Sequence, residues 1–369
     1  MGWRLVLSSL SLVSSAAAAF SLTEQTFQGR PAWVLENGIL RVAVLKSGGH
    51  IAEVRQTTGE AHRDINPMRV PHYPTIDPHT YDDARDNSRY GDDPHRWLSS
   101  GYMGHLLCFP AYGPPSSPEE VAAGLGNHGE APIVQWRKIG GGAHGDTITL
   151  RYTAELVKTQ YRVERTVTMQ RMLPWVRVEE SIENLLPFDR PVQWMQHATF
   201  GPPFVEPGKS LLRISAKRGH RNAELPEGES PSERMMPAET PAGSYTALLM
   251  DSSREYQFFT LTHPQYPVTI GYLFPTSTNP WAADWQENRR AQQKPWDGKV
   301  IARGIEFGTS PYAEGLKSAV SRGTLFNTPT FRWIAARQTL RTEFIVFMSE
   351  KHVRNAQWVN QQVVIDTDP

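Results

Sequence analysis

Four segments between Thr147 and Gly201 alternate apolar and polar residues with a period of two. They read TITLRYTAEL, QYRVERTVTMQ, WVRVEESIEN and PVQWMQHATFG, and turn-forming or strand-breaking residues separate them. This alternation is typical of β-strands with one buried face, and short links favour antiparallel neighbours. The pattern predicts a large antiparallel sheet and argues against repeated βαβ units.

Strand-like segments also open and close the chain. PAWVLENGILRVAVLKSGGHIAEVRQ predicts a three-stranded meander within Thr26–Thr57, with Asn37-Gly38 as a hairpin turn. SYTALLM, QFFTLTH, YPVTIGYLFP and FRWIAARQTLRTEFIVFM follow later. No shift in composition and no internal repeat marks a boundary, so we predict one all-β domain over residues 20–369.

Three stretches lack strand periodicity. Residues 60–100 are rich in Pro, Asp, His and Arg, which predicts a surface loop or lid; their His and Asp spacings match no metal-ligand pattern. The charged segment 217–240 is also expected to be a surface loop. SSPEEVAAGL predicts one short helix, with Ser117 as its cap and Pro118 in its first turn.

Composition limits the classes of ligand. The 369 residues contain 38 Lys and Arg and 38 Asp and Glu, so no net field attracts nucleic acid or an anionic membrane. The 11 Trp and 12 Tyr suit a carbohydrate site, because sugar rings stack on aromatic planes. The same aromatic residues also fill large β-cores, so composition alone leaves both interpretations open. Oligomeric state is left open too.

The pattern of the four strand segments and their neighbours resembles the galactose mutarotase-like superfamily, which includes the aldose 1-epimerases. The resemblance rests on four pieces in order: NGILRVAVLKSGGHIAEVR, GHLLCFPAYG with NHGEA and a later Trp, VRVEESIENLLPFDRPVQWMQHATFG, and RGIEFGTSPYAEG. Asn184 and His197 stand at matching places in the third piece. The resemblance implies a large antiparallel β-sandwich with a sugar cleft on one concave sheet.

The resemblance also implies catalytic roles. His197 is expected to act as general acid on the sugar ring oxygen and Glu306 as general base on the anomeric hydroxyl. His128 is expected to orient the substrate or share a proton. The chemistry is consistent, because exchanging anomers requires proton transfer at two oxygens, and imidazole and carboxylate groups both exchange protons near neutral pH. Such a reaction needs no metal or redox cofactor, and none is expected.

Further residues are interpreted as substrate ligands. In NPWAADWQEN, one of Trp281 and Trp285 is expected to stack on sugar from a cleft-rim loop, with Asp284 or Glu287 binding a hydroxyl. Arg89 is expected to reach the site from the lid. The competing interpretations are a loop clamped to the core by its two tryptophans and, for Arg89, a solvated charge.

One departure narrows the substrate. Relatives acting on hexose 6-phosphates carry an arginine just after the His-Gly pair, whereas this chain reads HGEAP, with Glu130. A carboxylate there disfavours a phosphate, so a non-phosphorylated sugar is expected. The alternatives are a non-catalytic carbohydrate-binding protein of the same fold and a polysaccharide lyase.

Residues 1–19 predict export. Arg4 precedes the apolar run LVLSSLSLVSS, and Ala16–Ala19 supply a small-residue cleavage site, which is the pattern of a signal peptide. The single cysteine, Cys108, leaves no intrachain disulfide and is expected to be a small buried apolar residue.

We therefore expect the exported protein to begin just after Ala19, in a periplasmic or extracellular compartment. N-terminal sequencing or intact mass of the protein recovered from outside the cytoplasm checks this. A mature chain that still starts at Met1 would contradict it.

Overall fold

Two large antiparallel sheets dominate the computed structural model, which describes residues 19–58, 65–262, 265 and 268–368. The predicted signal peptide lies almost entirely outside these residues. In spatial order the 11-stranded sheet contains β1 (Phe20–Phe27), β2 (Arg30–Asn37), β3 (Leu40–Leu45), β4 (Ile51–Gln56), β5 (His105–Cys108), β11 (Met195–Phe200), β20 (Ile301–Gly308), β19 (Trp281–Asn288), β16 (Ala242–Met250), β13 (Ala216–Arg221) and β14 (Ala223–Glu224).

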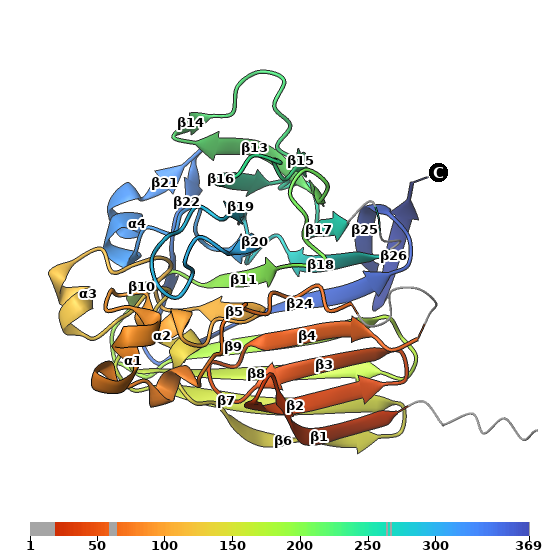
Figure 1. The fold of residues 1–369 in the computed structure, drawn as a ribbon, viewed down its shortest axis with the longest axis horizontal. Helices are drawn as coiled ribbons and strands as arrows, with labels where there is room; N and C mark the ends of the chain where they lie inside the picture. Colours follow the sequence, from red (N-terminus) through yellow and green to blue (C-terminus); the bar gives the residue numbers. More distant parts are fainter. Residues whose placement is uncertain (1–18, 59–64, 263–264, 266–267, 369) are drawn as a thin grey trace, which may run out of the picture.

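The second sheet has nine strands and packs against the first. In spatial order they are β15 (Glu233–Met235), β12 (Leu211–Ile214), β17 (Tyr256–Thr262), β18 (Thr269–Pro275), β24 (Thr339–Ser349), β9 (Trp175–Asn184), β8 (Tyr161–Gln170), β7 (Thr147–Leu156) and β6 (Arg137–His144). The end strands β1 and β6 lie beside each other (Figure 1), so the two sheets form a sandwich closed along that edge. The predicted all-β sandwich is confirmed.

Buried and exposed residues alternate along the strands, which explains why the two sheets pack face to face. Along β8 every second residue is buried, from Tyr161 to Met169, and the intervening residues are partly exposed. The buried side chains of both sheets meet in one apolar core. Cys108 is a buried free thiol, as expected, but it packs in a separate apolar cluster on the face of β5 that points away from this core.

The strand predictions hold better than the loop predictions. β2, β3 and β4 form the expected meander, and β1 precedes it. Segment 217–240 is not a loop throughout: it contains most of β13, which pairs with β14, and also β15. Backbone pairing in the sheets stabilises these charged strands despite their weak hydrophobic pattern.

Short helices and two-stranded ribbons complete the described chain. The helices are η1 (Pro78–Thr80), α1 (Asp83–Tyr90), α2 (Arg96–Ser99), α3 (Pro118–Ala122), η2 (Ala131–Ile133) and α4 (Leu316–Arg322). The ribbons pair β10 (Arg190–Val192) with β23 (Arg332–Ile334), β21 (Thr324–Leu325) with β22 (Thr328–Pro329), and β25 (Val353–Val359) with β26 (Gln362–Thr367).

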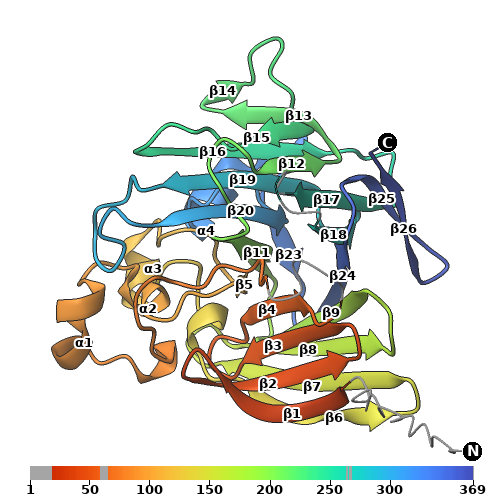
Figure 2. The same ribbon diagram turned by 45° about the vertical axis from the view of Figure 1, so that its right-hand side comes forward.

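The expected helix after Ser117 is confirmed as α3, whose Glu120 amide donates to the Ser117 hydroxyl. Residues 60–100, expected to be a surface loop, instead contain η1, α1 and α2 in their described part. These elements and α3 gather on one side of the molecule, next to the centre of the 11-stranded sheet (Figures 1 and 2). They are placed to wall a cleft there.

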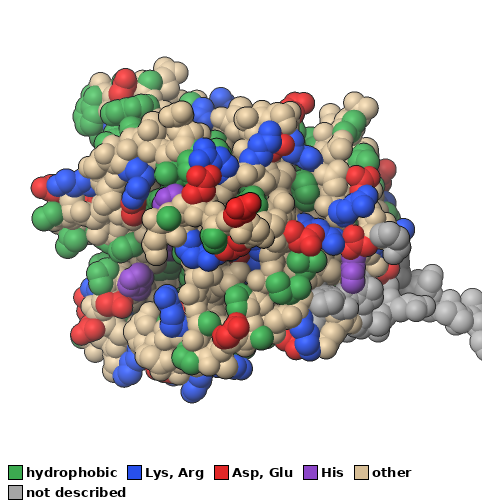
Figure 3. Space-filling model, turned by 90° about the horizontal axis from the view of Figure 1, so that it is seen from above, with side chains coloured by type: hydrophobic (Ala, Val, Ile, Leu, Met, Phe, Trp, Pro, Cys, Tyr) green, Lys and Arg blue, Asp and Glu red, His purple; other side chains and the backbone are tan. Residues whose placement is uncertain are grey.

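The outer surface carries both charges. Acidic and basic side chains are interspersed over the face shown in Figure 3, without a field of one sign. No helix within the described residues is long and apolar enough to cross a membrane.

A buried polar network fixes β11 from the core side. The Arg165 guanidinium pairs with the Glu180 carboxylate, and both side chains are fully buried. Gln196 joins them: its Nε2 donates to Glu180 Oε1 at 2.9 Å, and its Oε1 accepts from Arg165 Nη2 at 2.8 Å. His105 on β5 reaches the same Gln196 oxygen at 3.0 Å. The network ties β5, β8, β9 and β11 together.

Two buried histidines make the free energy of unfolding depend on pH. Burial lowers the pKa of His50 and of His105 to about 3, and nearby guanidinium groups add to the effect. Unfolding returns each imidazole to a pKa near 6.5, so the unfolded chain binds more protons between pH 3 and 6.5. The free energy of unfolding is therefore complete above about pH 6.5 and falls as the pH drops toward 3.

We expect His50→Gln to flatten this dependence by up to about 1.4 kcal/mol per pH unit between pH 6 and 4. Denaturant melts at several pH values measure it, with the exposed His144→Gln as the matched control. Identical slopes for His50→Gln and wild type would contradict the neutral buried state of His50.

Candidate active site

The centre of the site is a cross-strand pair on β11 and β20. These strands are antiparallel in a register that sets His197 directly opposite Glu306. Directly opposed residues share one face of a sheet, so both side chains leave the core and point to the same side. His197 Nε2 lies 3.0 Å from Glu306 Oε1, and the two side chains are only 5% and 2% exposed. The structure thus brings together the expected acid and base.

Burial sets the protonation of this pair. It lowers the pKa of His197 to about 3, and the positive charge of Arg69 adds to the effect. Burial also raises the pKa of Glu306 well above its ordinary value. Mutual attraction favours two ions, but the cost of desolvating both charges is larger. The free pair therefore holds one proton and no net charge, with Glu306 donating to His197 Nε2.

Two hydroxyl groups continue the chain of hydrogen bonds. Since His197 Nε2 accepts from Glu306, the imidazole proton lies on Nδ1, which is 2.8 Å from Thr199 Oγ1. Thr199 Oγ1 is in turn 2.5 Å from the Tyr102 hydroxyl. The tautomer of His197 is thus fixed from both sides of its ring.

One oxygen of Glu306 has no hydrogen-bond partner among the described residues. This oxygen, Oε2, is also buried. A buried carboxyl oxygen without a partner is costly unless a ligand or water completes it.

His128 faces this pair from a loop. Its ring lies edge-on to that of His197, with centroids 5.1 Å apart. The residue has a positive φ of 65° and is buried. Its Nδ1 accepts from the Gly113 amide at 3.2 Å, so the proton lies on Nε2 as a donor. Burial lowers the pKa of His128 well below its usual value, which keeps that donor neutral.

A cavity of about 310 Å³ lies above the pair. Its lining includes both histidines, Glu306, Tyr102, and the indoles of Trp285 and Trp296. The two indole rings are 5.9 Å apart, and Trp285 also meets the edge of His197 at 5.9 Å. His95 and Leu98 contribute from the helical segment, so the segment expected as a lid does border the site. The cavity combines aromatic walls with a few convergent polar groups, as sugar and other small-molecule sites do.

Gly304 provides the space in front of the pair. It sits opposite Trp285 on the cavity face of β20. A Cβ at this position would lie 2.9 Å from the Trp285 ring, 3.0 Å from His197 and 3.1 Å from Glu306 Oε1. Any side chain there would push on the three groups that define the floor.

Of the expected substrate ligands, Trp285 and Glu287 line the cavity. Glu287 is already engaged, because its Oε1 accepts from the amides of Arg290 and Ala291 at 2.5 and 2.9 Å. It shapes the rim loop as well as facing the cavity.

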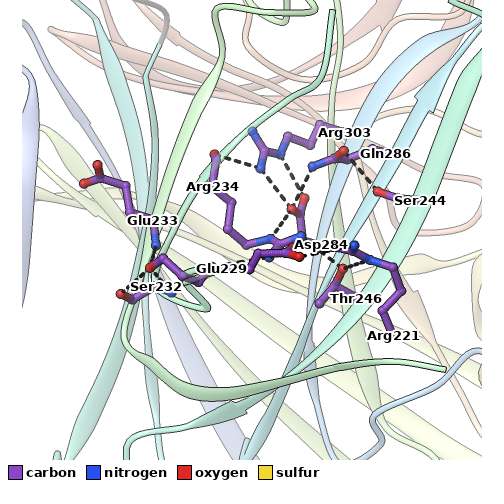
Figure 4. A network of polar contacts seen from close by, with 11 residues as sticks. Arg221, Glu229, Ser232, Glu233, Arg234, Ser244, Thr246, Asp284, Gln286 and Arg303 are labelled. Carbon is purple, nitrogen blue, oxygen red and sulfur yellow. Dashed lines mark hydrogen bonds and ion pairs between the residues drawn. The ribbon is translucent and has the colours of Figure 1, made fainter. Parts of the chain in front are cut away.

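Asp284 lies on the other face of β19, between the two sheets (Figure 4). Its carboxylate accepts from Arg303 at 2.9 and 3.0 Å and from Arg234 Nε at 2.9 Å. Burial alone would raise the pKa of Asp284, but the two guanidinium groups outweigh it and lower this pKa. NPWAADWQEN is a strand, not a rim loop, so Asp284 points opposite to Trp281 and Trp285.

Trp281 and Arg89 also lie outside the cavity lining. Trp281 is fully buried and donates from Nε1 to the Pro329 carbonyl at 2.7 Å, which ties β19 to the β21–β22 ribbon. Arg89 is exposed on α1 and stands over the Tyr90 ring. Asn184 closes a turn by donating to the carbonyls of Phe188, Ile334 and Ala335.

Glu130 faces away from the cavity and binds the 158–159 turn. Its carboxylate accepts from the amides of Lys158 and Thr159, each at 2.9 Å. Glu130 therefore does not repel a substrate phosphate directly. A phosphate is disfavoured because no arginine follows the His-Gly pair to bind it. The cation on the cavity lining is Arg290, which is largely exposed and lies 3.9 Å from Glu287.

Several site residues were not predicted from the sequence. Thr199 was detectable, since it lies two residues after His197 on the same strand face. Tyr102, Trp296 and Gly304 carry no local signal, because only the fold brings their segments to the cavity.

The chain matches known proteins at the level of family and fold. A family described as "Domain of unknown function (DUF4432)" matches residues 87–326. No curated protein sequence matches significantly. A galactose mutarotase-like protein from Clostridium acetobutylicum aligns with a TM-score of 0.59 at 12% identity, covering 89% of this chain and 98% of that chain.

Two further solved structures show the same similarity. A protein described as a candidate aldose 1-epimerase from Klebsiella pneumoniae gives a TM-score of 0.61 at 11% identity, covering 88% of this chain and 81% of that one. The Slr1438 protein of Synechocystis gives 0.55 at 15% identity, covering 93% and 100%. The chain therefore has the galactose mutarotase-like sandwich fold that the sequence resemblance implied.

The pKa of His197 can be tested without any substrate. We expect its imidazole NMR signals to stay those of the neutral ring from pH 8 to about pH 4, because burial opposes protonation. The variant His197→Gln assigns the signals. A titration midpoint near 6.5 would show that the pair is not desolvated as described.

Proposed function

Because the chain belongs to the DUF4432 family, whose description names no activity, we propose from the site itself that it is an aldose 1-epimerase-like enzyme. It interconverts the anomers of a non-phosphorylated sugar by acid–base ring opening. The observation that carries the proposal is the buried His197–Glu306 pair, because both of its residues line a sugar-sized cavity. The mutarotase-like names of proteins with the same fold support it.

The number of protons that the pair holds matches what the reaction requires. Glu306 accepts the proton of the anomeric hydroxyl while His197 delivers one to the ring oxygen, which opens the ring to the aldehyde. After rotation about the C1–C2 bond, the roles reverse and the ring closes as either anomer. The pair holds one proton throughout, so nothing has to be exchanged with solvent between the two halves of the cycle.

The bound sugar would change which group holds that proton. In the free site Glu306 is neutral because burial raises its pKa well above the ordinary value. A sugar hydroxyl that donates to the Glu306 carboxylate favours its ionised form, with the proton on His197. Substrate binding thereby prepares the base and the acid together. His128 Nε2–H supplies a further donor that orients a sugar oxygen.

The cavity walls favour a neutral ring. Trp285 and Trp296 offer apolar faces for the C–H side of a sugar, and Tyr102 borders the same space. Arg290 is the cation on the lining and is mostly exposed, so it does not form a buried anion site. A phosphorylated sugar would gain little there.

Glu306→Gln preserves the shape of the site but removes the proton acceptor. We expect at least about a 100-fold loss in the rate of anomer exchange, the usual contribution of a positioned general base. Polarimetry or one-dimensional NMR exchange on a panel of aldoses, free and 6-phosphorylated, measures it. The exposed Glu350→Gln is the matched control and should retain the wild-type rate.

The same panel separates the alternatives. If neither wild type nor Glu306→Gln accelerates anomer exchange of any sugar, the catalytic proposal fails. Saturable binding that survives Glu306→Gln and weakens with Trp285→Ala would then indicate a carbohydrate-binding protein. Release of an unsaturated product absorbing in the ultraviolet from a uronate polymer would indicate a lyase.

A further inference from the structure

A second pocket of about 410 Å³ adjoins the active-site cavity. Its lining comes from parts of the chain that do not include α1, α2 or α3. His220 at the end of β13, Asn222 after it, Tyr312 and Glu314 from the segment after β20, and Arg322 of α4 contribute to it.

The two pockets share a wall. Tyr245 and Ala313 line both of them. The Tyr245 side chain is held in place, because its hydroxyl donates to the Pro311 carbonyl at 2.7 Å and lies 2.9 Å from the Tyr112 hydroxyl. A ligand in the first cavity therefore has the second pocket next to it, across a fixed aromatic side chain.

The second pocket presents the groups that bind sugar hydroxyls. Tyr312 is partly exposed, its ring is 6.0 Å from that of Tyr245, and its hydroxyl bonds to His220 Nδ1. Arg322 stands over the Tyr312 ring and forms a two-point ion pair with Glu314 at 2.8 and 2.7 Å. Paired charges beside aromatic rings offer donors and acceptors without a net charge, which suits a neutral polyhydroxylated ligand rather than an ion.

We propose that this second pocket is a subsite for another sugar residue of the same substrate. The reducing-end ring occupies the cavity with its anomeric carbon at His197 and Glu306, and the residue linked to it occupies the second pocket. The preferred substrate is then a reducing disaccharide or short oligosaccharide rather than a monosaccharide. This inference rests on the proposed function and assigns its substrate class.

The test compares the kcat/KM of anomer exchange for glucose and galactose with that for maltose, cellobiose and lactose. We expect wild type to prefer at least one disaccharide by about tenfold or more. Arg322→Gln and Tyr312→Ala should each lower the disaccharide-to-monosaccharide ratio toward one. Arg322 is on the surface of a short helix, so its variant tests the subsite even if Tyr312→Ala folds poorly. The exposed Arg151→Gln on β7 is the matched control for the ratio.

The outcomes separate this inference from the function beneath it. If monosaccharides react as well as every disaccharide and the variants leave the ratio unchanged, the subsite is refuted while the epimerase activity stands. If no sugar reacts, the proposed function fails, and calorimetric titration of the same sugars decides the subsite. Tighter binding of a disaccharide that Arg322→Gln weakens would support it, and equal or absent binding would overturn it.

Discussion

The backbone register between β11 and β20 is the constraint on which the candidate site depends. A shift of one residue would turn His197 or Glu306 to the opposite face of the sheet and separate the pair. The register is secured from the core side, where Gln196 joins the Arg165–Glu180 ion pair. Gln196, which directly precedes His197, thus holds β11 in place from the core side. The buried polar network thereby helps to position the side chains on the opposite face of the sheet, which borders the cavity.

Two buried carboxyl groups on neighbouring strands have pKa values that are shifted in opposite directions. Asp284 on β19 is buried against two arginines, which lower its pKa and keep it ionised as a tie between the sheets. Glu306 on β20 is buried with only an imidazole beside it, and its pKa rises. Both groups are desolvated to a similar degree, so the number of cationic partners decides the difference. One carboxylate is structural, and the other is suited to proton transfer.

Periodicity in the sequence predicts the sandwich because each buried strand face repeats every second residue. It also places His197 and Glu306 on strands, but not opposite each other, since register between distant segments has no local signal. The segment NPWAADWQEN is a strand without a clear period-two pattern. Alanine and aspartate are weak strand formers, so it reads as a loop, and that interpretation put Asp284 beside the tryptophans instead of behind them. The residues of the cavity walls could not be predicted for a similar reason, because Tyr102 and Trp296 reach the site only through tertiary folding.

Strands form the floor of the cavity, whereas connections between strands contribute to its walls. The floor consists of central strands whose register is locked by long-range pairing, whereas the helical segment after β4 and the loop after β19 contribute the walls. Changes of length or sequence in these connections leave the strand pairing intact. Divergence in these connections can therefore change the shape and polarity of the cavity walls while leaving the His197–Glu306 pair in place. The walls and the floor of the cavity are thus free to evolve at different rates.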